Sequence, residues 1–230
     1  MKNEEVMVKG AANYVTNVDL AVQNFLKAEL GKAFPDIALI AEEKENTGLS
    51  EEGTYWILDP IDGTANLILD FRMSGLYEKG EIVFGAVFNP FTDELFHAAK
   101  GEGAYLNGNA IHASSTEHFG DAVISYGSTP YTKSEAKNLF PIFYNIFMKC
   151  GDFRRTGSAE LDMCYVACGR EHGYLECDLK PWDYSAGTII VREAGGVVRT
   201  WKGEEPAYLT NGDILACAPQ FEEILLKELA

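Results

Sequence analysis

The sequence predicts a layered α+β fold, in which helices pack against sheets that are at least partly antiparallel. Segments of helical and of strand character alternate along the chain. Apolar runs over 81–88 and 94–98 flank a proline-containing turn over 89–93, which is typical of an antiparallel hairpin. No repeat or low-complexity linker interrupts the 230 residues, so we expect one unit with subdomains roughly over 1–120 and 121–230.

The expected elements follow in order along the chain. Helical spacing predicts a helix over 17–34, and short apolar runs predict strands over 37–41 and 55–58. Apolar residues at i, i+3, i+4 and i+7 from Leu161 predict a helix with one buried stripe. The remaining elements are a strand over 122–126, a helix over 133–150 that Pro141 breaks or kinks, that striped helix over 158–168, a strand over 173–177, and a helix with Asp183 as its N-cap and Gly195 as its stop.

Charge and composition exclude several classes of function. The chain has 19 basic and 35 acidic residues, a net charge of −16, which argues against nucleic acid or an anionic membrane as a partner. The sequence has no long apolar span and no secretory signal, so we expect a cytoplasmic protein. The five cysteines lack the spacing of a zinc site. Because the chain is so acidic, an anionic ligand would need bound cations to supply positive charge.

The most informative segment is 55–64, where an apolar run ends in two acids. Asp59 and Asp62 are three residues apart, Pro60 stops the strand, and Gly63 permits a turn. Two carboxylates held close together repel each other unless they share a proton or bind a cation. Oxygen ligands without Cys or His favour Mg²⁺, Mn²⁺ or Ca²⁺ over zinc. The alternative is a surface turn with solvated acids.

Acids at two other element ends favour the cation. Glu42 and Glu43 follow the predicted strand over 37–41, and Asp183 stands at a predicted helix start. Taken singly, Glu42 fits a solvated acid and Asp183 a helix cap. Together with the pair in 55–64, they predict one carboxylate cluster.

Two motifs resemble the signatures of the inositol monophosphatase family of metal-dependent, lithium-sensitive phosphatases. The motifs are 59–64 and 182–187, the second followed by the Glu-Ala-Gly-Gly run of 193–196. The resemblance runs from about Asn13 to the C-terminus. It implies an αβαβα sandwich of the sugar phosphatase type with mixed and antiparallel sheets, a homodimer, and hydrolysis of a phosphate monoester with two or three Mg²⁺, or Mn²⁺ in their place.

The resemblance also implies the metal ligands. Glu42, Asp59 and Asp62 match the family's metal-ligand acids, Ile61 matches its carbonyl ligand, and Asp183 matches the ligand of the second metal. Glu42 counts among the catalytic residues because its metal would activate water. Asp183 would also lie against the substrate.

Further matches imply the groups that handle water, phosphate and sugar. Asp19 and Thr64 match a pair that takes the proton of the attacking water. Gly63 and Thr64 match the turn that contacts phosphate, and Glu176 and Ala159 match positions on the sugar side. Glu176 favours a polyol, so we expect myo-inositol monophosphate as substrate. Alternatives are fructose 1,6-bisphosphate, 3′-phosphoadenosine 5′-phosphate or histidinol phosphate, and, from another class, a catalytically silent metal- or phosphate-binding protein.

Three departures from the family pattern carry expectations of their own. Ala41 stands where the family usually has glycine, a mild change if the backbone there is extended. The chain is several residues short between Asn66 and Gly85, which predicts that a central strand is trimmed or missing. The helix before Gly10 is also expected to be truncated.

Overall fold

Two sheets enclose a pair of helices in this protein. The computed structural model describes residues 6–10, 13–42, 46–59, 72–128 and 133–230. The larger sheet has the order β3-β4-β5-β6-β7-β8-β9, and the smaller has the order β11-β10-β12-β14-β13. A separate hairpin is formed by β1 (Val6–Gly10) and β2 (Asn13–Thr16), where the sequence predicted a truncated helix.

The larger sheet is antiparallel apart from one pair. Strand β3 runs parallel to β4, and each strand from β4 to β9 pairs antiparallel with the next along the chain. Its strands are β3 (Ala38–Ala41), β4 (Thr54–Asp59), β5 (Arg72–Glu78), β6 (Glu81–Asn89), β7 (Glu94–Ala99), β8 (Gly103–Leu106) and β9 (Asn109–Ala110).

The smaller sheet is mixed and joins strands that are far apart in sequence. Strand β10 pairs in parallel with β11 and β12, whereas β14 pairs antiparallel with β12 and β13. Its strands are β10 (Val123–Tyr126), β11 (Asp152–Arg154), β12 (Gly173–Leu179), β13 (Val197–Thr200) and β14 (Gly212–Cys217).

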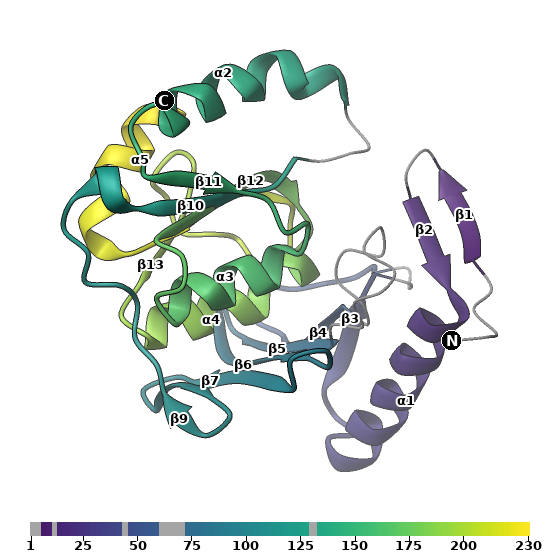
Figure 1. Cartoon of the computed structure of the whole chain (residues 1–230). Helices are drawn as coiled ribbons and strands as arrows, with labels where there is room; N and C mark the ends of the chain where they lie inside the picture. Colours follow the sequence, from purple (N-terminus) through teal and green to yellow (C-terminus); the bar gives the residue numbers. More distant parts are fainter. Residues whose placement is uncertain (1–5, 11–12, 43–45, 60–71, 129–132) are drawn as a thin grey trace.

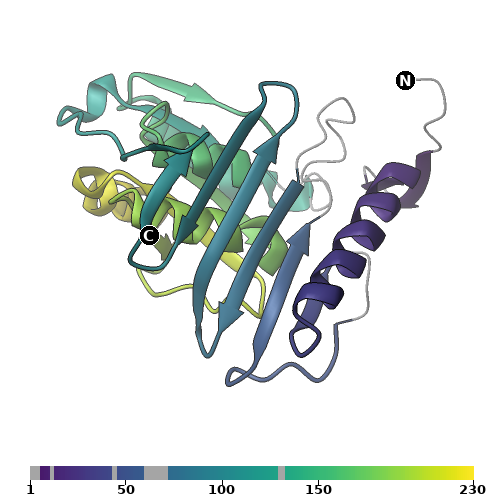
Figure 2. The same ribbon diagram turned by 90° about the horizontal axis from the view of Figure 1, so that it is seen from below.

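Helices complete the layers. Helices α3 (Ala159–Ala167) and α4 (Ser185–Glu193) lie between the sheets, and α2 (Ala136–Phe147) and α5 (Glu222–Leu229) cover the far face of the smaller one (Figure 1). Helix α1 (Asn17–Ala33) lies beside β3, as Figure 2 shows from below. The predicted α+β class with mixed and antiparallel sheets is confirmed.

The outer face of the larger sheet receives the end of α1. Ile57 belongs to the core between the sheets, so its neighbour Trp56 points to the opposite face. The Trp56 ring lies 5.6 Å from the ring of Phe34, directly after α1, and 6.3 Å from that of Phe84. These rings anchor the outermost helical layer.

Several expected elements are confirmed and others are wrong. The hairpin of β6 and β7 has the predicted antiparallel register. Helix α2 continues through Pro141 without a break. All residues of α3 except Tyr165 are buried, because α4 and both sheets surround the helix. The prediction that only one stripe of this helix is buried is therefore wrong. Strand β5 pairs along its whole length with β4 and β6, so the central strand is present.

Two glycines let α4 approach the larger sheet. Gly75 of β5 and Gly85 of β6 are partners in register. A Cβ at Gly75 would lie 3.3 Å from Ser185 Cβ, and one at Gly85 would lie 2.5 Å from Ala186 O. The start of α4 therefore sits against the backbone of β5 and β6.

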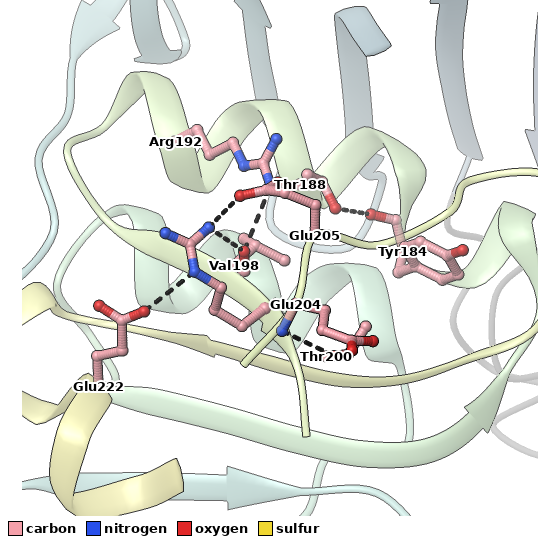
Figure 3. Close-up of polar contacts among 9 residues, drawn as sticks. Tyr184, Thr188, Arg192, Val198, Thr200, Glu204, Glu205 and Glu222 are labelled. Carbon is pink, nitrogen blue, oxygen red and sulfur yellow. Dashed lines mark hydrogen bonds and ion pairs between the residues drawn. The ribbon is translucent and has the colours of Figure 1, made fainter. Parts of the chain in front are cut away.

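Ion pairs hold the other end of α4 and the chain that follows it (Figure 3). Arg192 of α4 and Arg199 of β13 both pair with Glu205, and Arg199 Nε lies 3.1 Å from Glu222 Oε1 of α5. At the start of the helix, Thr188 Oγ1 donates to Tyr184 O at 2.7 Å. The Arg192 end of α4 is linked through Glu205 to Arg199 of β13, which in turn pairs with α5.

The start of β12 depends on a neutral imidazole. His172 Nδ1 accepts a hydrogen bond from Val123 N at 3.0 Å, and burial lowers the pKa of His172 below its ordinary value of 6.5. The unfolded chain therefore takes up this proton more readily, and the contribution of His172 to stability is lost as pH falls below about 6.5. We expect Tm to fall between about pH 7.5 and pH 5.5 by more in wild type than in His172→Asn, whose Oδ1 can accept without titrating. Equal falls would contradict this role.

Within the described residues, no helix is long and apolar enough to cross a membrane. None of the five cysteines, all of which lie in the described ranges, forms a disulfide.

Candidate functional site

Two of the predicted acids meet at one edge of the larger sheet. The parallel register of β3 and β4 pairs Ala41 with Leu58, so Glu42 and Asp59 are the next residues along two paired, neighbouring strands. Asp59 is the last residue of β4 and is only 2% exposed, and Glu42 is half-buried. A carboxylate so far out of water needs compensating hydrogen bonds or a cation. Two hard oxygen donors at a strand edge suit Mg²⁺, which binds one or two carboxylates besides water and phosphate.

The backbone before Glu42 is held by an amide that sequence reasoning missed. Asn46 Oδ1 accepts from Ala41 N at 3.2 Å, and Asn46 Nδ2 donates to Ala41 O at 2.9 Å. Ala41 ends β3 in extended conformation, so alanine fits where the family that the sequence resembles usually has glycine. A single Asn in a polar loop carries no pattern that would have revealed this contact.

Asp183 lies on a 3₁₀ turn against the strand that carries Asp59. The turn, η4 (Pro181–Asp183), contacts β4 and β5. Asp183 Oδ2 accepts from Lys180 N at 2.7 Å and so closes this turn. The prediction that Asp183 is the N-cap of the following helix is wrong, because the N-cap of α4 is Tyr184 and its side chain makes no capping hydrogen bond.

The Glu176 carboxylate lies close against the backbone of Gly127, just after β10. Tyr174 OH donates to Glu176 Oε2 at 2.6 Å. A Cβ at Gly127, just after β10, would overlap the Glu176 carboxylate, so glycine is needed there. Sequence reasoning missed both neighbours, although a glycine directly after a strand hints at a close approach.

A bulge in β12 separates Glu176 from the Asp183 turn. The register with β14 shifts between Glu176 and Leu179, and Asp178 has a φ of 55°. Asp178 N donates to Asp213 Oδ1 at 2.9 Å, which fixes the bulge. Bulges commonly re-aim the chain next to functional sites.

Ala159, the other residue predicted on the sugar side, is the first residue of α3 and is 6% exposed. Helix α3 packs on β12, the strand that carries Glu176.

The remaining predicted site residues lie at the start of α1 or outside the described ranges. Asp19 belongs to the first turn of α1. Ile61, Asp62, Gly63 and Thr64 lie outside the described residues. Across the ranges that are described, no three carboxylates, imidazoles or thiols gather as in a metal site. The described chain thus supplies part of a donor set.

The Glu-Ala-Gly-Gly run of the second motif has a structural role at the far end of α4. Glu193 accepts hydrogen bonds from Gly101 N and Gly103 N, both at 2.9 Å. Its carboxylate therefore binds the backbone donors of the glycine turn after β7. Gly195, with a φ of 84°, ends the helix. The Asp183 turn of the second motif, by contrast, contacts β4, the strand that ends in Asp59.

The whole chain, residues 1–230, matches the model of the inositol monophosphatase family. It is 36% identical over 229 residues to Nus factor SuhB of Escherichia coli (strain K12), covering 98% of this chain and 85% of that protein. It is 38% identical over 200 residues to inositol-1-monophosphatase of Rhizobium meliloti (strain 1021), covering 85% of this chain and 75% of the relative.

Solved structures agree with the fold. The extragenic suppressor protein suhB from Bartonella henselae superposes with a TM-score of 0.91 at 33% identity, covering 99% of this chain and 89% of the other. An IMPase/NADP phosphatase solved with Mg²⁺ and phosphate superposes with a TM-score of 0.87 at 26% identity, covering 98% and 85%. The chain belongs to the inositol monophosphatase family and is a phosphoric monoester hydrolase.

Proposed function

We propose that the protein hydrolyses the phosphate monoester of a small polyol, myo-inositol monophosphate, in a Mg²⁺-dependent reaction. The observation that carries the proposal is the buried carboxylate of Asp59 beside Glu42 at the shared edge of β3 and β4. A protein of charge −16 repels a phosphate dianion, so cations held by these acids must draw the substrate in. The Rhizobium relative is named for this substrate and the IMPase/NADP phosphatase was solved with Mg²⁺, which supports both parts of the proposal.

The proposed metal ligands come from two parts of the fold. Glu42 and Asp59, at the ends of β3 and β4, would hold the metal ions together with Asp62 and the Ile61 carbonyl, and Asp183 of η4 would complete the ligand set. When bound, Mg²⁺ makes water a better nucleophile and neutralises charge on the phosphate.

The remaining groups handle protons and substrate. Thr64 and Asp19 take the proton of the attacking water, and the N–H groups of Gly63 and Thr64 hold phosphate oxygens. Glu176, oriented by the hydroxyl of Tyr174, accepts a hydrogen bond from the polyol, and Ala159 lies on the same side. The homodimer implied by the resemblance and the cytoplasmic location expected from the sequence stay predictions.

The test is phosphate release from inositol 1-phosphate and from p-nitrophenyl phosphate. The alternative substrates, fructose 1,6-bisphosphate, 3′-phosphoadenosine 5′-phosphate and histidinol phosphate, are assayed in the same way. We expect turnover that stops on exhaustive chelation, returns with Mg²⁺, and is fastest with the inositol ester. Full activity without divalent ions would exclude the mechanism. No turnover of any ester would favour the catalytically silent protein.

Lithium sensitivity is tested in the same assay. Li⁺ is expected to inhibit at saturating Mg²⁺ because it would compete at the Asp183 end of the site. Unchanged rates in tens of millimolar LiCl, with NaCl as the ionic control, would remove this property from the proposal.

A further inference from the structure

A buried carboxylate joins the two central helices. Glu160, the second residue of α3, is 0% exposed. Its Oε1 accepts a hydrogen bond from Ala186 N at 3.0 Å, and its Oε2 accepts one from Gly187 N. Both N–H groups lie in the first turn of α4, where backbone donors have no partner within their own helix. Glu160 thus caps α4 from a different helix.

The residue at the N-cap position does not perform this capping, because the side chain of Tyr184 makes no capping hydrogen bond. Asp183, one residue earlier, accepts from Lys180 N and so closes η4. A carboxylate at a helix N-terminus interacts favourably with the helix dipole, and bonds to an ionised acceptor are stronger than neutral ones. Glu160 therefore determines where α4 starts relative to α3.

Gly187 makes room for this contact. A Cβ at Gly187 would collide with Glu160 Oε2 and would lie 2.8 Å from Met163 Cβ. Glycine is a poor helix former, about 1 kcal/mol worse than alanine in a helix interior, so its presence in α4 is explained by the close approach of α3.

The start of α4 is linked in turn to the Asp183 turn. Ser185 Oγ, at the first residue of α4, donates to Pro181 O of η4 at 2.5 Å. The backbone of Ser185 and Ala186 also rests against Gly75 of β5. A shift of the helix start would therefore move η4 relative to the larger sheet, where Glu42 and Asp59 lie.

We propose that Glu160 is a positioning residue, which fixes the first turn of α4 and thereby holds Asp183 in place for a metal ion. The proposal rests on the proposed function, in which Asp183 is a metal ligand. Groups that orient metal ligands from behind typically change metal affinity or activity by about 10- to 100-fold when they are removed.

The test compares Glu160→Ala with a matched control at the other end of α4. Glu193→Ala also removes a carboxylate that accepts two backbone N–H bonds, but those bonds hold the glycine turn remote from Asp183. For each variant, Mg²⁺ binding is measured by calorimetric titration, and the Mg²⁺ concentration for half-maximal hydrolysis of p-nitrophenyl phosphate is measured separately.

We expect Glu160→Ala to weaken Mg²⁺ binding and raise the half-activating concentration by about tenfold or more. Glu193→Ala should lower Tm and leave both Mg²⁺ readouts unchanged. Glu160→Gln, whose carbonyl oxygen keeps one of the two N–H bonds, should lie between wild type and Glu160→Ala. In an Asp183→Asn background, Glu160→Ala should add little, because both changes act on the same ligand.

The outcomes separate this proposal from the proposed function. If wild type neither binds Mg²⁺ nor hydrolyses phosphate esters, the proposed function fails and this proposal with it. If wild type does both and Glu160→Ala leaves the Mg²⁺ readouts unchanged, Glu160 is only a structural cap and this proposal alone is overturned. If Glu160→Ala does not fold, a folded Glu160→Gln with wild-type Mg²⁺ dependence overturns it in the same way.

Discussion

Asp59→Asn is expected to lower kcat by about a thousandfold, roughly 4 kcal/mol of transition-state stabilisation, while the chain still folds. The substitution keeps the size of the side chain and removes a negative charge from a position that is 2% exposed. In the proposed mechanism that charge holds the cation that activates water, so its loss acts on the chemical step for every substrate.

Glu176→Gln is the matched comparison on the sugar side. Gln keeps an acceptor for the Tyr174 hydroxyl, which lies 2.6 Å from Glu176 Oε2, so the local packing survives. We expect a raised KM and a changed preference among sugar phosphates, with kcat for p-nitrophenyl phosphate close to wild type. Equal loss of turnover with all substrates in this variant would place Glu176 in the phosphate machinery instead. A fully active Asp59→Asn enzyme would remove the carboxylate edge from catalysis.

Mg²⁺ is expected to raise Tm by several degrees more than NaCl of the same ionic strength. Carboxylates that converge in the metal-free protein repel each other, and an ion that binds only the folded state adds RT ln(1 + [L]/Kd), about 2.7 kcal/mol at a hundred times Kd. For a chain of this size each kcal/mol is worth about 2–4 °C. Sodium is the necessary control, because screening alone also relieves a net charge of −16.

The double variant Asp59→Asn plus Asp183→Asn identifies where the ions bind. It should lose the Mg²⁺-specific rise and keep the response to NaCl. Thermal unfolding with and without MgCl₂ measures both. If the Mg²⁺-specific rise survives in the double variant, the ions bind elsewhere and the acids of the β3–β4 edge and of η4 do not form one site.

Local patterns predicted the acid-bearing strand ends well. An apolar run followed by an acid is a signal within a few residues, and it correctly placed Glu42 and Asp59 after β3 and at the end of β4. Strand β5 gave no such signal, because it contains Arg72 and Gly75 and owes its conformation to pairing on both sides. Glycine looks like a strand breaker in sequence, whereas here it admits α4.

Contacts between distant residues could not be predicted. Glu160 caps donors 26 and 27 residues away, and Glu193 binds a turn about 90 residues earlier. Both acids fit ordinary positions in a helix pattern, so nothing local marks them. The prediction of Asp183 as N-cap failed for the same reason: the sequence shows a capping residue near a helix start but not which carboxylate the fold brings there.

The difference in connectivity between the two sheets has a consequence for the order of folding. From β4 to β9 each strand pairs with its neighbour along the chain, whereas β12 must pair with β14, which follows it only after α4 and β13. Contacts between neighbouring segments close small loops and form quickly, and distant pairings form late. We therefore expect the larger sheet to form early and α4 to dock onto it afterwards, so that Asp183 joins Asp59 in one of the last steps. Catalytic competence would then arise only when folding is complete, and a partly folded chain could not hydrolyse the phosphate esters around it.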